Sequence, residues 1–194
     1  MKPVAAGAEW RKGAWHNEDV AALRAAGNVA APASEANPYC FAPPIAPHLA
    51  AAEAHVTVNP DTVALAYAAL ARRADVVVVE GAGGYLVPLG AELDMAALAA
   101  RLALPIVLVV GMRLGCLNHA LLTADAIRAR GATFAGWVAN HVDAHMARVD
   151  QNVESLAARL DAPLLGRIAH GAAPQVVAAS LDLGTLLAAT GRAR

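Results

Sequence analysis

The chain has 194 residues, of which 58% are hydrophobic and 16% are charged. So large an apolar share excludes a disordered chain, and the length favours a single domain over residues 1–194. The formal net charge is −1, which provides no electrostatic footprint for nucleic acid or for an anionic membrane surface. We therefore expect a globular protein with no nucleic-acid and no membrane partner.

Three features of the sequence bear on its location. The longest dense apolar run, residues 102–112, is too short to span a bilayer. The first fifteen residues lack the apolar core of a signal peptide. Cys40 and Cys116 stand far apart and outside any CxxC motif, which predicts free thiols in a reducing compartment. The expected location is the cytoplasm.

The first part of the chain shows little regular patterning. Residues 1–17 are predicted to form a loop, and Glu18 to Ala26 a short helix that ends at Gly27. Residues 28–48 contain a run of prolines between Pro38 and Pro47, which predicts irregular structure.

From residue 60 onward, helices and strands alternate. Helices are predicted over 61–73, 94–104, 118–130 and 145–160, and strands over 76–79, 106–110, 134–140 and 163–168. Asp61 and Asp94 are the expected caps of the first two helices, and the first of these has one apolar face, formed by Val63, Ala66, Tyr67 and Leu70. The runs at 76–79 and 106–110 are continuously apolar, which is typical of strands buried on both faces. The alternation predicts an α/β fold, a parallel sheet with helices on both faces, whose strand-to-helix loops meet at one ligand-binding edge.

The loop after the first of these runs contains the most informative motif. Glu80 ends the run and is followed by Gly81, Ala82 and Gly83. A carboxylate in this position is typical of a magnesium site in nucleotide enzymes, and glycines allow backbone amides to approach an anion closely. The alternative is a glycine-rich turn closed by a surface glutamate.

Two other nucleotide-binding motifs do not fit. A GxGxxG dinucleotide fingerprint requires glycine where Leu86 stands. A Walker A loop ends in Gly-Lys-Ser/Thr, and neither Lys2 nor Lys12, the only lysines of the sequence, stands in such a motif.

The loops after the later strands offer weaker candidates, each with a structural alternative. Residues 115–120 enter a helix through small residues, so they favour either an anion at the helix N-terminus or an ordinary asparagine cap. Asn140 at a strand end is suited to an adenine edge, or is an ordinary strand-end residue. His141 and His145 have the i, i+4 spacing of zinc ligands, but with no third ligand nearby, two solvated histidines are the simpler interpretation.

Taken together, these segments resemble the dethiobiotin synthetases. The motifs that carry the resemblance follow the family order along essentially the whole chain: KPVAAG at 2–7, HNEDV at 16–20, NPYCFAPPIAPH at 37–48, VVVVEGAGGYLVPL at 76–89 and LGCLNH at 114–119. The resemblance implies a P-loop NTPase-like fold and a cytoplasmic, homodimeric, ATP- and Mg2+-dependent cyclo-ligase. It also implies the reaction, in which 7,8-diaminononanoate and CO2 are joined and closed to dethiobiotin.

The resemblance further implies a role for individual residues. Lys2 is the catalytic lysine, which contacts the carbamate and the γ-phosphate, and Asp19 and Glu80 hold magnesium. The residues implied for the nucleotide are Asp19, Glu80, Gly81, Ala82, Gly83, Asn140, His141, Ala169, His170 and Gly171. The residues implied for the substrate are Ala6, where the family usually has serine, and Gly115, Cys116, Leu117 and Asn118, which act across the dimer interface.

One departure from the family pattern is large. Family members begin with a strand and a P-loop ahead of the KPV segment, whereas Met1 directly precedes Lys2 here. We therefore expect the first strand and the P-loop to be missing and the chain by itself to be impaired. The alternative function is a non-catalytic or inactive truncated homologue that completes the substrate site of a full-length dimer partner.

Overall fold

The computed structural model describes residues 1–190. The chain divides into two compact units, Met1–Ala103 and the part from Leu104 onward, and each is described by itself. Both units contain parallel strands and helices, which confirms the α/β class. The single domain expected over 1–194 stays a prediction. Within the described range, no helix is long and apolar enough to cross a membrane.

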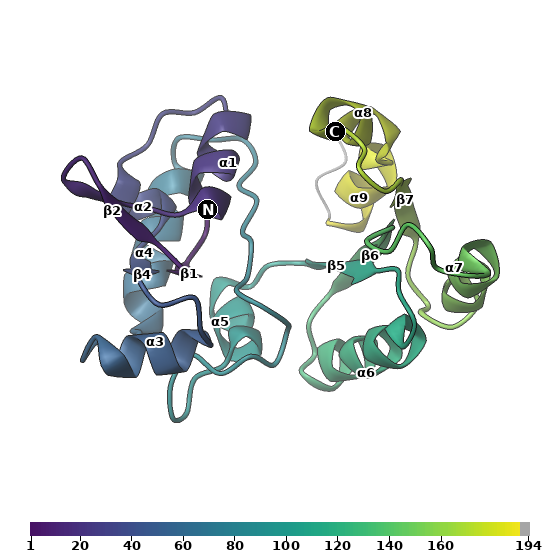
Figure 1. Ribbon diagram of the computed structural model, residues 1–194, viewed down its shortest axis with the longest axis horizontal. Coiled ribbons are helices and arrows are strands. Elements are labelled where there is room, and N and C mark those ends of the chain that lie inside the picture. Colours follow the sequence, from purple (N-terminus) through teal and green to yellow (C-terminus); the bar gives the residue numbers. More distant parts are fainter. Residues whose placement is uncertain (191–194) are drawn as a thin grey trace. The chain divides into compact units, whose positions relative to one another are not determined.

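The first unit is built around short strands and five helices, coloured purple to teal in Figure 1. Two of its strands pair in parallel, and two others form an antiparallel hairpin. Its elements are β1 (Val4–Ala6), β2 (Glu9–Arg11), β3 (Ala14–His16), α1 (Glu18–Ala26), α2 (Ala33–Ala36), β4 (Tyr39–Phe41), α3 (Pro47–Glu53), α4 (Pro60–Ala71) and α5 (Met95–Leu102).

The predicted helix at 18–26 is confirmed with the same bounds. The irregular structure predicted on either side of it is present at residues 28–32 and 42–46, but the prediction is wrong where β1, β2, β3, α2 and β4 form. β1 pairs in parallel with β4, with Val4 opposite Tyr39 and Ala6 opposite Phe41. Val4 and Phe41 are buried. The prolines of residues 28–48 flank β4 rather than interrupt it, so they leave its backbone N–H groups free to pair.

The run at 76–79, predicted as a buried strand, is not a strand in the structure. Val76 and Val78 are 57% and 68% exposed. The end of the run lies beside Met1, whose backbone N donates to the Val78 carbonyl at 2.7 Å and whose carbonyl accepts from the Glu80 N–H at 2.9 Å. A β-branched run forms a strand when a neighbouring segment hydrogen-bonds to its backbone along its whole length. Met1 forms such bonds on either side of a single residue, which is too little for a strand.

The next two helices follow the predicted pattern closely. Val63, Ala66 and Leu70 of α4 are buried, as their spacing predicts. The residue that caps α4 is Asn59 rather than Asp61, since its side chain accepts a hydrogen bond from the Asp61 N–H. Asp94 caps α5 as predicted.

The second unit contains a three-stranded parallel sheet of order β5-β6-β7. The strand positions predicted at 106–110, 134–140 and 163–168 are thereby confirmed. Its elements are β5 (Ile106–Gly111), α6 (Cys116–Ala129), β6 (Phe134–Asn140), α7 (Val149–Ala157), β7 (Leu164–Ile168), α8 (Pro174–Ser180) and α9 (Leu183–Ala189). The helix predicted over 145–160 is therefore shorter, and the one predicted from 118 begins two residues earlier.

Helices lie on both faces of this sheet, as predicted. On one face, Trp137 of β6 packs in a core cluster with residues of α6 and α7 such as Ala124 and Leu156. On the other face, a Cβ at Gly166 of β7 would lie 2.8 Å from Leu181, between α8 and α9. The central strand β6 is thus covered on both sides (Figure 1).

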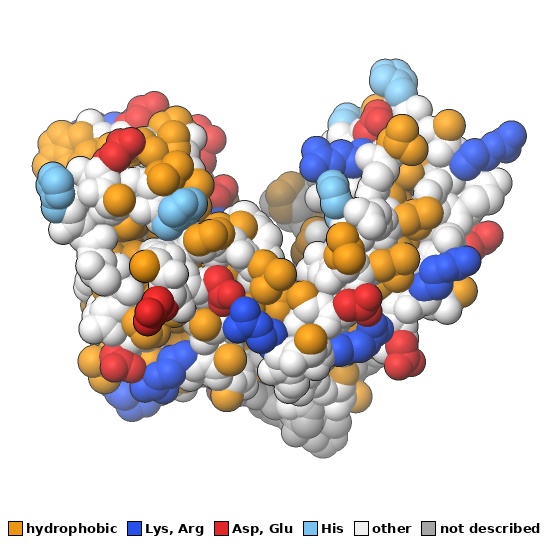
Figure 2. All heavy atoms as spheres, turned by 90° about the horizontal axis from the view of Figure 1, so that it is seen from below, with side chains coloured by type: hydrophobic (Ala, Val, Ile, Leu, Met, Phe, Trp, Pro, Cys, Tyr) orange, Lys and Arg blue, Asp and Glu red, His pale blue; other side chains and the backbone are white. Residues whose placement is uncertain are grey.

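The prediction that the run at 106–110 is buried on both faces is wrong. Val107 and Val109 of β5 are exposed, whereas Val110 is buried. The reason is position, because β5 is an edge strand of this sheet. Figure 2 shows charged side chains of both signs interspersed over the face that it presents, consistent with the near-zero net charge.

Candidate active site

Lys2 is the centre of a charged cluster in the first unit. Its Nζ lies 2.6 Å from Oε1 of Glu80 and 2.9 Å from Oδ2 of Asp19, and it donates to the Gly81 carbonyl at 3.2 Å. The three charged residues come from three segments. Lys2 lies just before β1, Asp19 lies in the first turn of α1, and Glu80 begins the loop after residue 79. The structure therefore brings together the predicted lysine, both predicted carboxylates and the first glycine of the motif.

Burial differs sharply among the three charged groups. The Lys2 side chain is 6% exposed, whereas those of Asp19 and Glu80 are 57% and 46% exposed. Burial by itself lowers the pKa of Lys2, but the hydrogen bonds and charges of the two carboxylates outweigh it and hold this pKa above its ordinary value. Lys2 is therefore a buried, positively charged side chain in contact with the solvent-facing carboxylates of Asp19 and Glu80.

The glycine turn has a conformation that its sequence requires. Gly83 has φ +75°, and a Cβ there would lie 2.9 Å from Cγ2 of Val87. Gly81 has less constrained torsions, but its Cβ would lie 3.0 Å from the Met95 side chain. The turn thus needs glycine at Gly83 for its backbone, whereas at Gly81 the contact is with the terminal methyl group of a flexible methionine.

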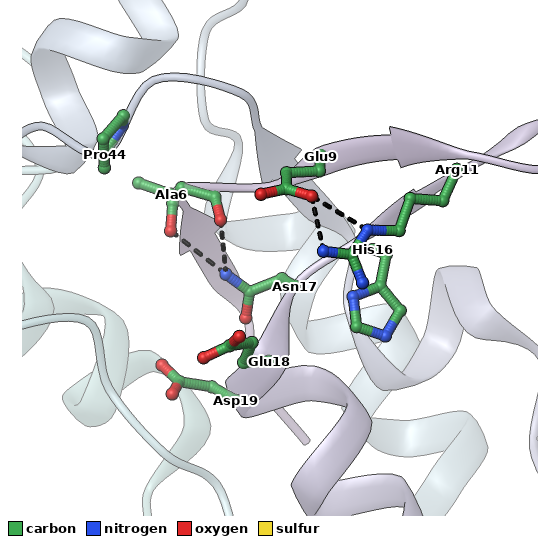
Figure 3. A pocket seen from close by; sticks show the side chains of 9 residues that line it. Ala6, Glu9, Arg11, His16, Asn17, Glu18, Asp19 and Pro44 are labelled. Carbon is green, nitrogen blue, oxygen red and sulfur yellow. Dashed lines mark hydrogen bonds and ion pairs between the residues drawn. The ribbon is translucent and has the colours of Figure 1, made fainter.

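A cavity of about 270 Å³ adjoins Asp19, and Figure 3 shows it from close by. The predicted Ala6 lies on its wall, where it offers no side-chain hydrogen bond. Within the cavity, the Arg11 guanidinium is held by Glu9, with its Nε 2.8 Å from Oε2. The lining residues are Ala6, Gly7, Glu9, Arg11, His16, Asn17, Glu18, Asp19 and Pro44.

Most of these lining residues were not predicted from the sequence. Glu9, Arg11 and His16 belong to the hairpin β2-β3, which was predicted as loop. The available signal was Gly13, since a glycine between two short segments, each with a tryptophan, is typical of a hairpin turn.

The strand-end residues predicted for the nucleotide gather in the second unit. Asn140 ends β6, and its carbonyl accepts from the Met112 N–H at 2.7 Å. Nδ1 of His170, from the loop after β7, lies 3.2 Å from the His141 carbonyl. Nε2 of His141 is buried and has no hydrogen-bond partner among the described residues. The carboxyl ends of β6 and β7 therefore place Asn140, His141 and His170 together.

The predicted substrate segment forms the start of α6. Gly115 is the residue before the helix, with φ +93°, and no side chain caps the helix. Asn118 is therefore not the cap that the structural alternative predicted. Cys116 is 2% exposed and packs in the core of the second unit, so its thiol is closed to a ligand, whereas Asn118 is exposed.

Comparison with known proteins gives two findings. A family model described as an AAA domain matches residues 1–191. The chain is also 57% identical over 185 residues to the ATP-dependent dethiobiotin synthetase BioD of Aromatoleum aromaticum (strain DSM 19018 / LMG 30748 / EbN1), a match that covers 94% of this chain and 82% of the relative. The chain belongs to the dethiobiotin synthetase family. The predicted resemblance and the predicted enzyme class, an ATP-dependent ligase, are thereby confirmed.

The donor set of this family member suits one kind of metal. Across residues 1–190, no group of three or more His, Cys, Asp or Glu side chains is placed to hold a metal, which leaves the His141 and His145 pair without a zinc site. Asp19 and Glu80 provide two solvent-facing carboxylates, both of which form an ion pair with Lys2. Magnesium is commonly bound by one or two carboxylates together with substrate phosphates and water, so this pair fits it.

Proposed function

We propose that the chain catalyses the ATP- and Mg2+-dependent carboxylation of 7,8-diaminononanoate with CO2 and the ring closure to dethiobiotin. The observation that carries the proposal is the buried Lys2 ammonium held between Asp19 and Glu80 at the glycine turn. Family membership supports it, because the relative's name states an ATP-dependent dethiobiotin synthesis. The proposal includes a cytoplasmic homodimer.

The proposed reaction has three steps. One amine of the substrate attacks CO2 and loses a proton, which gives a carbamate. A carbamate oxygen then attacks the γ-phosphorus of ATP, and ADP leaves. The second amine attacks the carbonyl carbon of the resulting mixed anhydride, phosphate leaves, a proton is lost, and the ureido ring is closed.

The role of Lys2 in these steps is electrostatic. Negative charge accumulates on the carbamate and on the transferred phosphoryl group, and a fixed ammonium beside them lowers the barrier without reorganisation. The pKa of Lys2 lies above its ordinary value, so the side chain stays charged at neutral pH and does not serve as a base. Asp19 and Glu80 would hold magnesium, which supplies charge neutralisation on the phosphates when bound.

The other predicted residues have proposed roles that follow the family resemblance. Residues 80–83 line the nucleotide, and the backbone N–H groups of residues 81–83 face its phosphates, because the Glu80 N–H already donates to the Met1 carbonyl. Asn140, His141 and the loop 169–171 contact the adenine, and the gathering of Asn140, His141 and His170 supports this. The N–H groups at the start of α6 bind the substrate carboxylate of the opposite subunit.

The sequence contains its own control for testing this function. Lys2 and Lys12 are the only lysines, and Lys12 lies in the exposed hairpin turn between β2 and β3. The assay uses a form that carries a family P-loop segment ahead of Met1, with diaminononanoate, bicarbonate and saturating MgATP, and formation of dethiobiotin is followed by mass spectrometry. We expect Lys2→Ala to lower turnover by about a hundredfold or more and Lys12→Ala to leave it unchanged. Equal turnover in the two variants would exclude the proposed role of Lys2.

A further inference from the structure

Two asparagine side chains lie at the ends of β1, the strand that follows Lys2. In the part of the chain that the structure describes, Asn17 and Lys2 are the buried polar or charged residues, at 8% and 5% exposure. A buried amide is costly unless it is hydrogen-bonded, so the partners of Asn17 matter.

Asn17 joins the end of β1 to the start of α1. Its Nδ2 donates to the Ala6 carbonyl at 3.1 Å and lies 3.5 Å from the Gly7 carbonyl, as the dashed lines in Figure 3 show. Its Oδ1 accepts from the Val20 N–H at 3.2 Å, which caps α1. Asp19 stands in the first turn of this helix, so the amide of Asn17 fixes the turn that carries one partner of Lys2.

Asn37 performs the corresponding task at the other end of β1. Its Nδ2 donates to the Lys2 carbonyl at 2.7 Å and to the Tyr39 carbonyl at 2.9 Å. The Lys2 N–H in turn donates to the Ala36 carbonyl at 2.8 Å. The backbone of Lys2 is therefore held on both sides by the segment ahead of β4.

We infer that Asn17 and Asn37 are positioning residues, whose amides tie both ends of β1 and thereby hold the Lys2 ammonium against the Asp19 carboxylate. β1 and β4 are three residues long each, and so short a ladder fixes the strand ends weakly. The two amides supply the missing constraint. The inference rests on the proposed function in one respect, that the geometry at Lys2 serves catalysis.

Three variants and a control test this positioning. Asn17→Ala removes both the amide donor and the helix cap. Asn17→Ser keeps an oxygen that caps α1 but removes the amide that reaches Ala6, and Asn37→Ala removes the other tie. The control is Asn59→Ala, because the Asn59 side chain accepts from the Asp61 N–H and thereby caps α4, a helix of the same unit that carries neither Lys2 nor Asp19.

The first measurement is independent of activity. At one fixed pH, an amine-acetylating reagent modifies the full chain briefly, and mass spectrometry gives the ratio of Lys2 to Lys12 modification. Loss of one tie loosens Lys2, so we expect the ratio to rise about fivefold in all three variants and to stay unchanged in Asn59→Ala. A ratio at the wild-type value in both Asn17→Ser and Asn37→Ala, or an equal rise in Asn59→Ala, would overturn the inference. Thermal midpoints verify that each variant is folded.

The second measurement separates the inference from the proposed function. For the same variants, kcat for dethiobiotin formation is expected to fall with the KM for diaminononanoate nearly unchanged, since the defect lies at Lys2. If the modification ratio rises while Lys2→Ala keeps wild-type turnover, the positioning stands and the proposed function fails. If Lys2→Ala loses turnover while the ratio is constant in every variant, the function stands and the positioning fails.

Discussion

Lys2 and Glu80 are separated by 78 positions in the sequence, yet Nζ of the lysine lies 2.6 Å from Oε1 of the glutamate. The backbone reinforces this contact, because the Glu80 N–H donates to the Met1 carbonyl at 2.9 Å. The ammonium lies between two carboxylates that would otherwise repel each other across the same space. One buried cation thus holds two anionic groups open to solvent, where a hard cation and phosphates are able to reach them.

The first prediction concerns Glu80. Glu80→Gln keeps the shape of the side chain and removes an anionic oxygen ligand, so we expect turnover to fall by about a hundredfold or more. The fold is expected to persist, because the side chain is 46% exposed and the Lys2 contact to Asp19 remains. The control is Glu92→Gln, an exposed glutamate of the loop before α5. If the turnover of Glu80→Gln is close to that of Glu92→Gln, Glu80 is only part of the glycine-rich turn and is not a metal ligand.

The second prediction concerns stability against pH. The pKa of Lys2 is raised in the folded protein, so its ion pairs stabilise the fold fully below the unfolded-state pKa of about 10.4 and are lost as pH rises through the folded value. Lys2→Met removes this contribution. We therefore expect the difference in thermal midpoint between wild type and Lys2→Met to be constant from neutral pH to about pH 9 and to narrow above about pH 10.4. A difference that widens with rising pH would contradict this sign.

The sequence predicted those parts of the fold whose signals are local. Gly27 marks the end of α1 and Asp94 caps α5, so the end of the first helix and the start of the second were predicted accurately. β1 and β4 were missed because each has three residues and becomes a strand only through the other. The exposure of Val109 was missed because a continuous apolar run does not reveal whether its strand is central or at an edge. The exposure of Val76 and Val78 was missed because the run does not reveal whether another strand pairs with it.

The candidate site divides in the same way. Glu80 and its glycines were visible as a motif, whereas Lys2 and Asp19 entered through the family resemblance alone. The contact among the three depends on pairing between segments far apart in the sequence, which no local pattern encodes. Asn17 and Asn37 were not singled out because an asparagine beside a helix end has an ordinary explanation as a cap.

The third prediction concerns the glycine turn. Gly83→Ala places a Cβ 2.9 Å from Val87 in a backbone conformation with φ +75°, so we expect a loss of about 1–2 kcal/mol in the free energy of unfolding. Gly84→Ala is the matched control, because its Cβ lies 4.0 Å from Val87 in ordinary contact. Denaturant unfolding of both variants measures the difference. Equal stabilities would show that the turn relaxes without cost.

The fourth prediction concerns nucleotide affinity. The 194 residues contain no Gly-Lys-Ser or Gly-Lys-Thr sequence, so the backbone cradle and lysine of a P-loop are not among them. We expect these residues alone to bind MgATP weakly, and a form that carries a family P-loop segment ahead of Met1 to bind it tightly. Isothermal titration calorimetry compares the two. Micromolar affinity of the 194-residue chain for MgATP would contradict this expectation.

The last prediction tests whether the substrate site is shared between two subunits. Asn118 is exposed at the third position of α6, where an acidic residue is compatible with the helix dipole. Asn118→Asp is therefore expected to fold and to repel the substrate carboxylate, whereas a charged residue at the buried Cys116 would disrupt the core. Alone, Asn118→Asp and Lys2→Ala are each expected to be nearly inactive.

Mixing the two variants decides between a shared site and a site within one chain. In a heterodimer, one of the two sites combines the intact Lys2 of one subunit with the intact Asn118 of the other. Random subunit exchange in an equal mixture should therefore recover about a quarter of wild-type turnover. Native mass spectrometry verifies that heterodimers form. Heterodimers without recovered turnover would show that the start of α6 does not serve the site of the opposite subunit.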